Sequence, residues 1–441
     1  MSSTYSKDLE VYTAKQFKDS VSGASNVYLT FGRVRPWANE ANPPQANTSG
    51  AAFYETWREM IGGKKINGND IRHVIPRHDW TSNTVYVAYD DLADSRQLKS
   101  SNSKFYVITD AFNVYKCIAN NYGQPSTYKP TSTNPSSQFQ TADKYIWKYM
   151  YTLTGEEQLR FTTNYFFPVK TLLEDDNSLQ WQVQEDAVSG AIHSILIQNT
   201  GVGYTSNNIS VVINGDGHFA NAYAIRNVFT DQIDSFVIDN KGSGYTYANV
   251  QIKSSSGAGA TARGIISPPG GHGSDALREL GGSYLIINPQ LDGSEGGIIV
   301  TQNDYRRISI IADPYVYGTT NVSTNQAFSQ VTTISLAQSS STTDFTLDEV
   351  VYQGPDLPNA TFKGIVAAWD SANSIIKLNN VDGNPTSALL TGNTSATSRY
   401  INSVTQPDLV PYSGRILYKD NITAIERAED QTEDFKIILS F

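Results

Sequence analysis

Residues 27–31 read Val27-Tyr28-Leu29-Thr30-Phe31, and they decide the class of fold. Valine and threonine branch at Cβ, and tyrosine and phenylalanine carry rings; these side chains favour a pleated strand. Gly32 follows, and Pro36 comes soon after it, where it can end a strand because proline donates no backbone hydrogen bond. The stretch therefore predicts a β-strand.

Short stretches of the same kind recur along the chain, and we expect a strand at each of them. They are residues 85–89, 105–109, 114–118, 145–151 and 435–441. Residues 110–113 join the second stretch to the third, which predicts a hairpin. The last stretch ends the chain. Because an unpaired terminal strand would expose its edge, we expect it to close a sheet.

Helical signals are few. Residues 8–21 can form one amphipathic helix. Ser49 can cap a second helix, which we expect Gly62-Gly63 to end. Its apolar residues at helical spacing are Phe53, Trp57, Met60 and Ile61. Thr154 and Glu157 form a capping-box pattern that predicts a short third helix. The fold class predicted is mainly all-β with a few short helices.

One motif occurs twice. Gly201-Val202-Gly203-Tyr204-Thr205 matches Gly242-Ser243-Gly244-Tyr245-Thr246, which begins 41 residues later. An apolar strand precedes each copy, and a second strand, a glycine-rich turn and a third strand follow it. Residues 187–270 are therefore expected to be a two-copy, Gly-rich β insertion forming one sheet or two. The stretch Pro268-Pro269-Gly270-Gly271-His272-Gly273 is expected to be the linker that ends it.

Residues 344–399 are expected to form an inserted small β-barrel-like module. Its strands are predicted at residues 345–352, 360–369 and 374–381, and the Ser/Thr run 339–343 before it is typical of a linker. Residues 120–141 are rich in Pro, Ser, Thr, Asn and Gln, which predicts an exposed loop.

These segments suggest a multi-domain β-sandwich. We expect residues 1–85 to form the N-terminal part of the core sandwich domain, completed by residues 300–336 and 404–441. Residues 86–186 are expected to form a second β domain. The two insertions, 187–270 and 344–399, are then separate small β elements.

Charge and cysteine content exclude several classes of protein. The chain has 441 residues, with 33 Lys and Arg against 43 Asp and Glu, a formal charge of −10. Such an acidic surface repels phosphate backbones, so no nucleic-acid partner is expected. The single cysteine, Cys117, excludes an internal disulfide framework. No secretory signal and no apolar run long enough for a membrane span is recognised, so no membrane partner is expected.

No motif in the chain demands an enzyme. His73 and His78 are separated by a proline and have no third ligand nearby, so no metal site is expected. Asn214-Gly215-Asp216-Gly217 is typical of a tight turn and lacks the ligand series of a calcium loop. The acidic residues 174–176 and 185–186 are typical of solvated loops. We therefore expect no cofactor, no small-molecule substrate and no catalytic residue.

The residues after the first strand have two open interpretations. Arg33, Arg35 and Trp37 can form the edge of a core strand, or they can contact another protein, since Trp, Tyr and Arg are the usual anchors of protein interfaces.

Several blocks together resemble the baseplate wedge subunit family of T-even-type contractile-tailed bacteriophages, the product of gene eight. The blocks are Tyr28-Leu29-Thr30-Phe31-Gly32-Arg33 with Pro36-Trp37, residues 57–62, Val74-Ile75-Pro76-Arg77 with Asp79-Trp80, Tyr145-Ile146-Trp147 with Tyr149, Ile308-Ser309-Ile310-Ile311 with Pro314, Ser413-Gly414 with Tyr418, and Asp430-Gln431-Thr432-Glu433 with Phe441. The resemblance covers about residues 28–192, 304–314 and 406–441. It leaves out the two insertions.

The resemblance implies an all-β, sandwich-like structural protein with no enzymatic role. Members of this family lie in each baseplate wedge, bind other wedge subunits and form a dimer when isolated. The expected location is the virion tail baseplate, after assembly in the host cytoplasm. The candidate interface or family-motif positions are Arg33, Arg35, Trp37, Arg77, Trp80, Trp147, Gln431 and Glu433.

Two other functions remain open from the sequence. One is a host-glycan-binding tail protein that uses exposed Tyr and Trp side chains. The other is a tail-associated glycosidase, which would need two carboxylates from different strands about 5–10 Å apart in a cleft.

Overall fold

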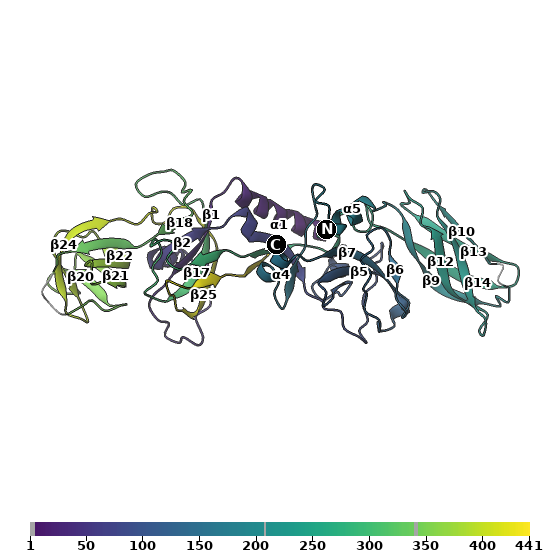
Figure 1. The fold of residues 1–441 in the computed structure, drawn as a ribbon, viewed down its shortest axis with the longest axis horizontal. Coiled ribbons are helices and arrows are strands. Elements are labelled where there is room, and N and C mark those ends of the chain that lie inside the picture. The colour runs from purple at the N-terminus through teal and green to yellow at the C-terminus, as the bar shows by residue number, and fades with distance from the viewer. Residues whose placement is uncertain (1–4, 207–208, 339–342) are drawn as a thin grey trace. The chain divides into compact units, whose positions relative to one another are not determined.

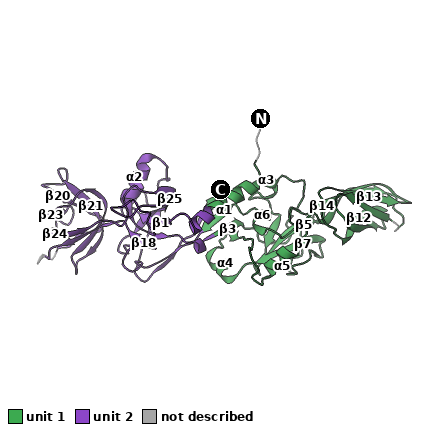
Figure 2. Cartoon of the chain, turned by 90° about the horizontal axis from the view of Figure 1, so that it is seen from above, with its two compact units in different colours: residues 1–16, 72–286, 438–441 green, residues 17–71, 287–437 purple. Residues whose placement is uncertain are grey.

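The computed structural model describes residues 5–206, 209–338 and 343–441. The chain is mostly β-strand with few short helices, as predicted (Figure 1). It divides into two compact units (Figure 2). Unit 1 comprises the described part of residues 1–16 with 72–286 and 438–441, and unit 2 comprises residues 17–71 and the described part of 287–437.

Unit 2 is built on a five-stranded antiparallel sheet. Its order is β18 (Ala327–Ser329), β2 (Met60–Lys65), β1 (Val27–Gly32), β17 (Tyr305–Ala312) and β25 (Arg415–Ile425). Every residue of β1 and β17 is buried, because these strands lie in the interior of the sheet and are covered on both faces. The predicted strand at residues 27–31 is confirmed.

The second predicted helix is α2 (Gly50–Glu59), and Ser49 caps it by accepting a hydrogen bond from the backbone N–H of Ala52. The prediction was wrong about its end, because Met60, Ile61 and Gly62-Gly63 lie in β2. A Cβ on Gly63 would lie 2.7 Å from the carbonyl oxygen of Leu29 and from the ring of Phe328. These glycines therefore allow neighbouring strands to approach closely and are not a helix stop.

Unit 2 also contains a closed barrel, which confirms that a barrel-like module is present. The barrel extends beyond the predicted residues 344–399, because it includes a strand at residues 332–336, which was expected in the core sandwich, and ends at residue 405. Its strands in barrel order are β19 (Thr332–Leu336), β22 (Ile375–Gly383), β21 (Phe362–Asp370), β20 (Val350–Gln353), β23 (Leu389–Gly392) and β24 (Ser398–Thr405). Buried apolar side chains fill the barrel, among them Ile334, Phe362, Val366 and Leu378. Of the expected linker, residues 339–342 lie outside the described residues.

The remaining elements of unit 2 are short. They are η1 (Gly68–Asp70) and the two-stranded sheet of β16 (Gln290–Asp292) and β26 (Thr432–Asp434). The first predicted helix is confirmed as α1 (Lys7–Ser22), whose first part belongs to unit 1.

Unit 1 contains a four-stranded sheet in the order β4 (Tyr106–Ile108), β5 (Asn113–Asn120), β7 (Tyr145–Thr152) and β6 (Phe139–Gln140). Strands β4 and β5 pair antiparallel, which confirms the predicted hairpin. Around the sheet lie α3 (Ser95–Leu98), η2 (Asn121–Gly123), α4 (Gly155–Arg160), α5 (Leu179–Glu185) and α6 (Ala276–Glu279). Thr154 and Glu157 form the predicted capping box at the start of α4.

The C-terminal stretch is paired, as predicted. Strand β27 (Ile437–Ser440) is the first strand of a sheet that continues with β15 (Tyr284–Ile287), β3 (Ile71–Pro76) and β8 (Phe166–Pro168). Val74, Phe161 and Ile286 form the buried apolar cluster of this part of unit 1.

Two predictions in unit 1 need correction. Residues 85–89 form no strand, because their backbone hydrogen bonds go to separate segments. The N–H of Val87 donates to the carbonyl oxygen of Lys104, and the N–H of Tyr89 donates to that of Cys117. Residues 120–141 are mostly irregular but only partly exposed. Ser126 is fully buried, and Phe139 and Gln140 join the sheet as β6.

The two motif copies form one six-stranded sheet. Its order is β12 (Gln232–Asn240), β11 (Asn221–Asn227), β10 (Ile209–Gly215), β13 (Ala248–Ser254), β14 (Ala258–Ile266) and β9 (Ile192–Val202). The first copy supplies β9–β11 and the second supplies β12–β14. When each strand is replaced by its counterpart in the other copy, the strand order is the same read from the opposite edge of the sheet. Val211 pairs with Ile252, which stands 41 residues later, so the local two-fold relation passes through this pair.

Each copy completes the other through its motif tyrosine. The Tyr204 hydroxyl accepts a hydrogen bond from the N–H of Ala260 at 3.2 Å, and the Tyr245 hydroxyl accepts one from the N–H of Ala220 at 3.3 Å. A Cβ on Gly257 would lie 2.5 Å from the Tyr204 ring, and one on Gly217 would lie 2.4 Å from the Tyr245 ring. The glycine in each turn therefore leaves room for the tyrosine ring of the other copy.

We expect Gly257→Ala to loosen this sheet, because the added methyl group overlaps the Tyr204 ring. Overpacking of this kind costs about 1–3 kcal/mol. Hydrogen exchange measured by mass spectrometry should show reduced protection in both β9 and β14. Gly264→Ala is the matched control, since its Cβ would meet its nearest atom at an ordinary 3.4 Å. Equal protection in the two variants would contradict the interlock.

Candidate functional site

The residues after β1 turn back on their own unit. Arg33 has a left-handed backbone, with φ of 59°, and its N–H donates to the carbonyl oxygen of Glu59 at 2.9 Å. Its guanidinium lies 3.7 Å from the centre of the Trp37 ring. The Trp37 indole N–H in turn donates to the carbonyl oxygen of Ile422 at 2.9 Å. Arg33 and Trp37 thus form a stacked cation–π pair inside unit 2.

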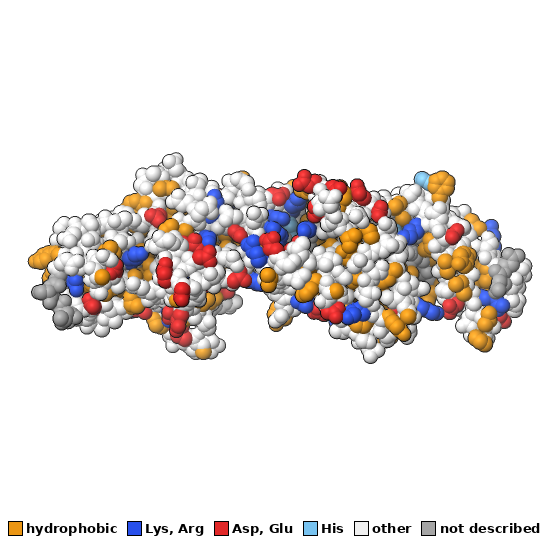
Figure 3. Space-filling view, viewed as in Figure 1, with side chains coloured by type: hydrophobic (Ala, Val, Ile, Leu, Met, Phe, Trp, Pro, Cys, Tyr) orange, Lys and Arg blue, Asp and Glu red, His pale blue; other side chains and the backbone are white. Residues whose placement is uncertain are grey.

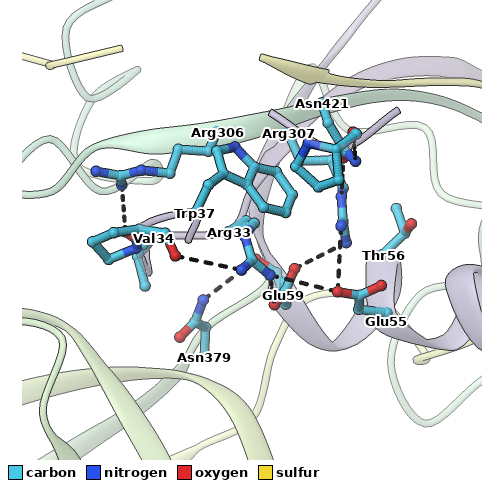
Figure 4. A network of polar contacts seen from close by, with 12 residues as sticks. Arg33, Val34, Trp37, Glu55, Thr56, Glu59, Arg306, Arg307, Asn379 and Asn421 are labelled. Carbon is cyan, nitrogen blue, oxygen red and sulfur yellow. Dashed lines mark hydrogen bonds and ion pairs between the residues drawn. The ribbon is translucent and has the colours of Figure 1, made fainter. Parts of the chain in front are cut away.

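Glu59, the last residue of α2, joins two arginines (Figure 4). Its carboxylate accepts from Arg33 at 2.7 Å and from Arg307 of β17 at 2.9 Å. Arg307 also donates to the Asn421 side chain of β25 at 2.8 Å. Burial raises the pKa of Glu59, and the two guanidinium groups oppose that shift. The network therefore ties a helix and two strands together through one carboxylate.

We expect Glu59→Ala to destabilise unit 2 strongly, because it leaves the buried Arg307 without its nearest carboxylate. Removing one member of a buried pair costs about 3–5 kcal/mol. Glu55→Gln is the control, since Glu55 contacts the same arginines from a side chain that is 47% exposed and should cost less than about 1 kcal/mol. Urea unfolding of both variants checks the difference, and similar midpoints would refute the role of Glu59.

The C-terminal candidates lie in a second buried network of unit 2. Glu433 forms an ion pair with Arg427 at 2.6 Å and accepts from the Tyr305 hydroxyl at 2.8 Å. Gln431 contributes its carbonyl oxygen, which accepts from the N–H of Gly293. Burial, with the nearby Glu433 carboxylate, raises the pKa of Tyr305 above its usual range.

The candidates in unit 1 also have partners within that unit. Arg77 forms an ion pair with Asp79 at 2.9 Å, and the Trp80 indole N–H donates to the Ser126 hydroxyl at 3.3 Å. Trp147 is fully buried and stacks on Tyr145, with ring centres 5.6 Å apart.

The structure does not bring the candidate residues into one site. Arg33, Arg35, Trp37, Gln431 and Glu433 belong to unit 2, and the other three belong to unit 1. Arg35 alone among the candidates is largely exposed. A role for these residues in contacts with other subunits remains a prediction.

Sequence reasoning missed a buried charge cluster in unit 1. Lys116 of β5 is 1% exposed and forms an ion pair with Glu279 of α6 at 2.6 Å. Its ammonium also donates to Nδ1 of His272 at 2.9 Å and lies over the Tyr89 ring. His193 of β9 packs edge-on against His272, with ring centres 4.8 Å apart. The signal was a lysine in the middle of an apolar strand.

The stretch around His272 is therefore not the linker that its prolines and glycines predicted. His272 is 2% exposed, and the N–H of Gly273 donates to Glu279 at 2.7 Å. Burial, together with the nearby lysines, holds the pKa of His272 well below its usual range, and burial lowers the pKa of His193 as well. Burial also lowers the pKa of Lys148 to about 8.

We expect the stability of unit 1 to fall below pH 6.5. The pKa of each buried histidine is lower in the folded state than in the unfolded state, so the unfolded state takes up a proton that the folded state does not. Stability is thus retained above pH 6.5 and lost below it, by about 1.4 kcal/mol per pH unit for each histidine. Urea unfolding at pH 7.5 and 5.5 measures this.

His272→Gln should reduce this pH dependence. His218→Gln, which changes an exposed histidine of the same unit, should leave it unchanged. The same pH dependence in the wild type and in both variants would contradict the assignment to the buried pair.

Unit 1 also holds a cavity of about 980 Å³ between the sheet that contains β5 and the sheet of β9–β14. Its lining carries two carboxylates among the described residues, Asp90 and Asp234. Asp90 pairs with Arg263 at 2.6 Å, and Asp234 pairs with Lys144 at 3.6 Å. Both carboxylates therefore have cationic partners within unit 1.

The other residues weighed for chemistry have structural surroundings. His73 is buried, and its Nδ1 lies 2.9 Å from the carbonyl oxygen of Gly282. Cys117 is buried, and burial raises the pKa of its thiol well above the usual range. Within residues 5–206, 209–338 and 343–441 no three His, Cys, Asp or Glu side chains are grouped to hold a metal ion. No helix in the described part of the chain is long and apolar enough to span a membrane.

Part of the chain is similar to a known family. The family model Phage-Gp8, described as Bacteriophage T4, Gp8, matches residues 13–134. The comparison with curated proteins found no match. The matched residues include β1 and β2 of unit 2 and β4 and β5 of unit 1, whereas both inserted β elements lie outside the match. The match confirms the resemblance inferred from the sequence: residues 13–134 are similar to the Gp8 family, whose members are structural proteins of the phage tail baseplate.

Proposed function

We propose that this protein is a wedge subunit of a contractile phage tail, which binds neighbouring wedge subunits during baseplate assembly. The observation that carries the proposal is the family match at residues 13–134. The matched segment supplies strands to the central sheets of both units, so the family likeness concerns the framework of the chain and not one appended module.

The internal contacts support a structural role. Glu433 and Glu279 are buried, Glu59 is partly buried, and each is paired with an arginine or a lysine of its own unit. Such pairs fix the packing of their neighbours, because moving one partner away would leave a buried charge. Units of this kind suit a subunit that shifts as a rigid body when the tail contracts.

The partners proposed are other wedge subunits and a second copy of this chain. The chain's acidic charge favours protein partners over nucleic acid. Arg35 and the exposed parts of the inserted modules are the surfaces that we propose for these contacts.

An electron cryo-microscopy map of the assembled tail tests the proposal. We expect density for this chain in each wedge, sixfold around the tail axis, in contact with at least one other wedge protein. Absence of the chain from mature particles would overturn the proposal. Hydrolysis of a polysaccharide by the purified chain, or specific binding on a glycan array, would instead favour one of the alternative functions.

A further inference from the structure

The turn between β11 and β12 presents two apolar side chains to solvent. Phe229 is 93% exposed and Val228 is 60% exposed. We call residues 227–231 the hairpin tip. Hydrophobic side chains are visible on the surface over this sheet (Figure 3). A phenylalanine that is almost fully exposed forgoes the favourable burial of its ring, so its position needs a reason.

The hairpin tip is held in one conformation by its own contacts. The Asn227 side-chain oxygen accepts from the N–H groups of Phe229 at 2.9 Å and Thr230 at 3.3 Å. The N–H of Asp231 donates to the carbonyl oxygen of Asn227 at 2.9 Å, and the Asp231 carboxylate pairs with Arg226 at 3.1 Å. The turn is thus ordered without a partner, which lowers the entropy cost of binding one.

The apolar surface extends beyond the hairpin tip. The carbonyl oxygen of Asp231 accepts from the N–H of Tyr204 at 2.9 Å, so the tip lies at the same end of the sheet as the end of β9. Val202, the last residue of β9, is 66% exposed. The residue of the second copy that corresponds to Val202, 41 residues later, is the polar Ser243. Only the first copy presents apolar side chains outward at this position.

We propose that the hairpin tip inserts Phe229 and Val228 into an apolar pocket on a neighbouring baseplate protein. This inference rests on the proposed function and adds to it the surface that makes the contact. A large ring on a rigid support is typical of the residues that dominate binding energy at protein interfaces. A lipid surface fits less well, because Arg226 is paired with Asp231 and the chain carries a charge of −10, which anionic headgroups repel.

The test uses the full chain, supplied in trans to a phage that lacks its gene. We expect Phe229→Ala to lower the amount of chain per purified particle at least tenfold. Asn227→Ala should lower it less, because the ring remains but its support is removed. Phe229→Leu, which keeps an apolar side chain, should recover part of the loss. Quantitative mass spectrometry of the particles measures all three.

Two controls separate the hairpin tip from exposure in general. Thr230→Ala changes the next residue of the same turn, and Leu173→Ala removes an apolar side chain that is 91% exposed elsewhere in unit 1. Both should be incorporated like the wild type. A photo-crosslinking residue at position 229 should form an adduct with one other protein of the particle.

The outcomes distinguish the two proposals. If the wild-type chain is absent from particles, the proposed function fails. If the wild type is present and Phe229→Ala is incorporated equally well, or the crosslinker at position 229 forms no protein adduct, the hairpin-tip inference fails while the function stands. Binding to phosphatidylglycerol vesicles that Phe229→Ala abolishes would also overturn it, in favour of a membrane contact.

Discussion

A carboxylate taken out of water must be paired with a cation or hydrogen-bonded, and several cores of this protein are organised around such a carboxylate. Glu59 joins α2 to two strands of the unit 2 sheet, and Glu433 joins Arg427 to Tyr305. Glu279 forms a buried ion pair with Lys116 of β5 in unit 1. In the barrel, Glu349 accepts from the N–H groups of Thr346, Thr394 and Ser395 at 2.7–2.9 Å. Several charged side chains of the protein are therefore buried inside its two units.

This use of charge agrees with the structural role proposed for the protein. A buried ion pair adds little net stability, but it penalises every packing that separates its members. A subunit that moves as a rigid body needs a core with a single packing arrangement. The movement then changes its contacts with neighbouring subunits and leaves its own core unchanged. The inserted β elements lie outside the family match, so they enlarge the surface without altering the sheets that the matched segment builds.

The sequence was sufficient for features that depend on local pattern. Alternation and side-chain type predicted the strand at residues 27–31 and the hairpin of β4 and β5, and spaced glycines predicted the repeated element. Predictions failed where a residue serves a distant neighbour. Gly62-Gly63 looked like a helix stop because the approach of Leu29 and Phe328 cannot be seen in the chain order. Likewise, Lys116 and His272 are 156 residues apart, and no local pattern relates them.

The reciprocal placement of Tyr204 and Tyr245 has a consequence for synthesis of the chain. Strand β9 emerges from the ribosome first but pairs with β14, the last strand of the sheet. Until the second copy has been made, the first has an unpaired edge and a tyrosine ring with no turn to cover it. During that interval the second copy of a neighbouring chain offers the same strand and turn, which is the condition under which strand exchange between chains can occur.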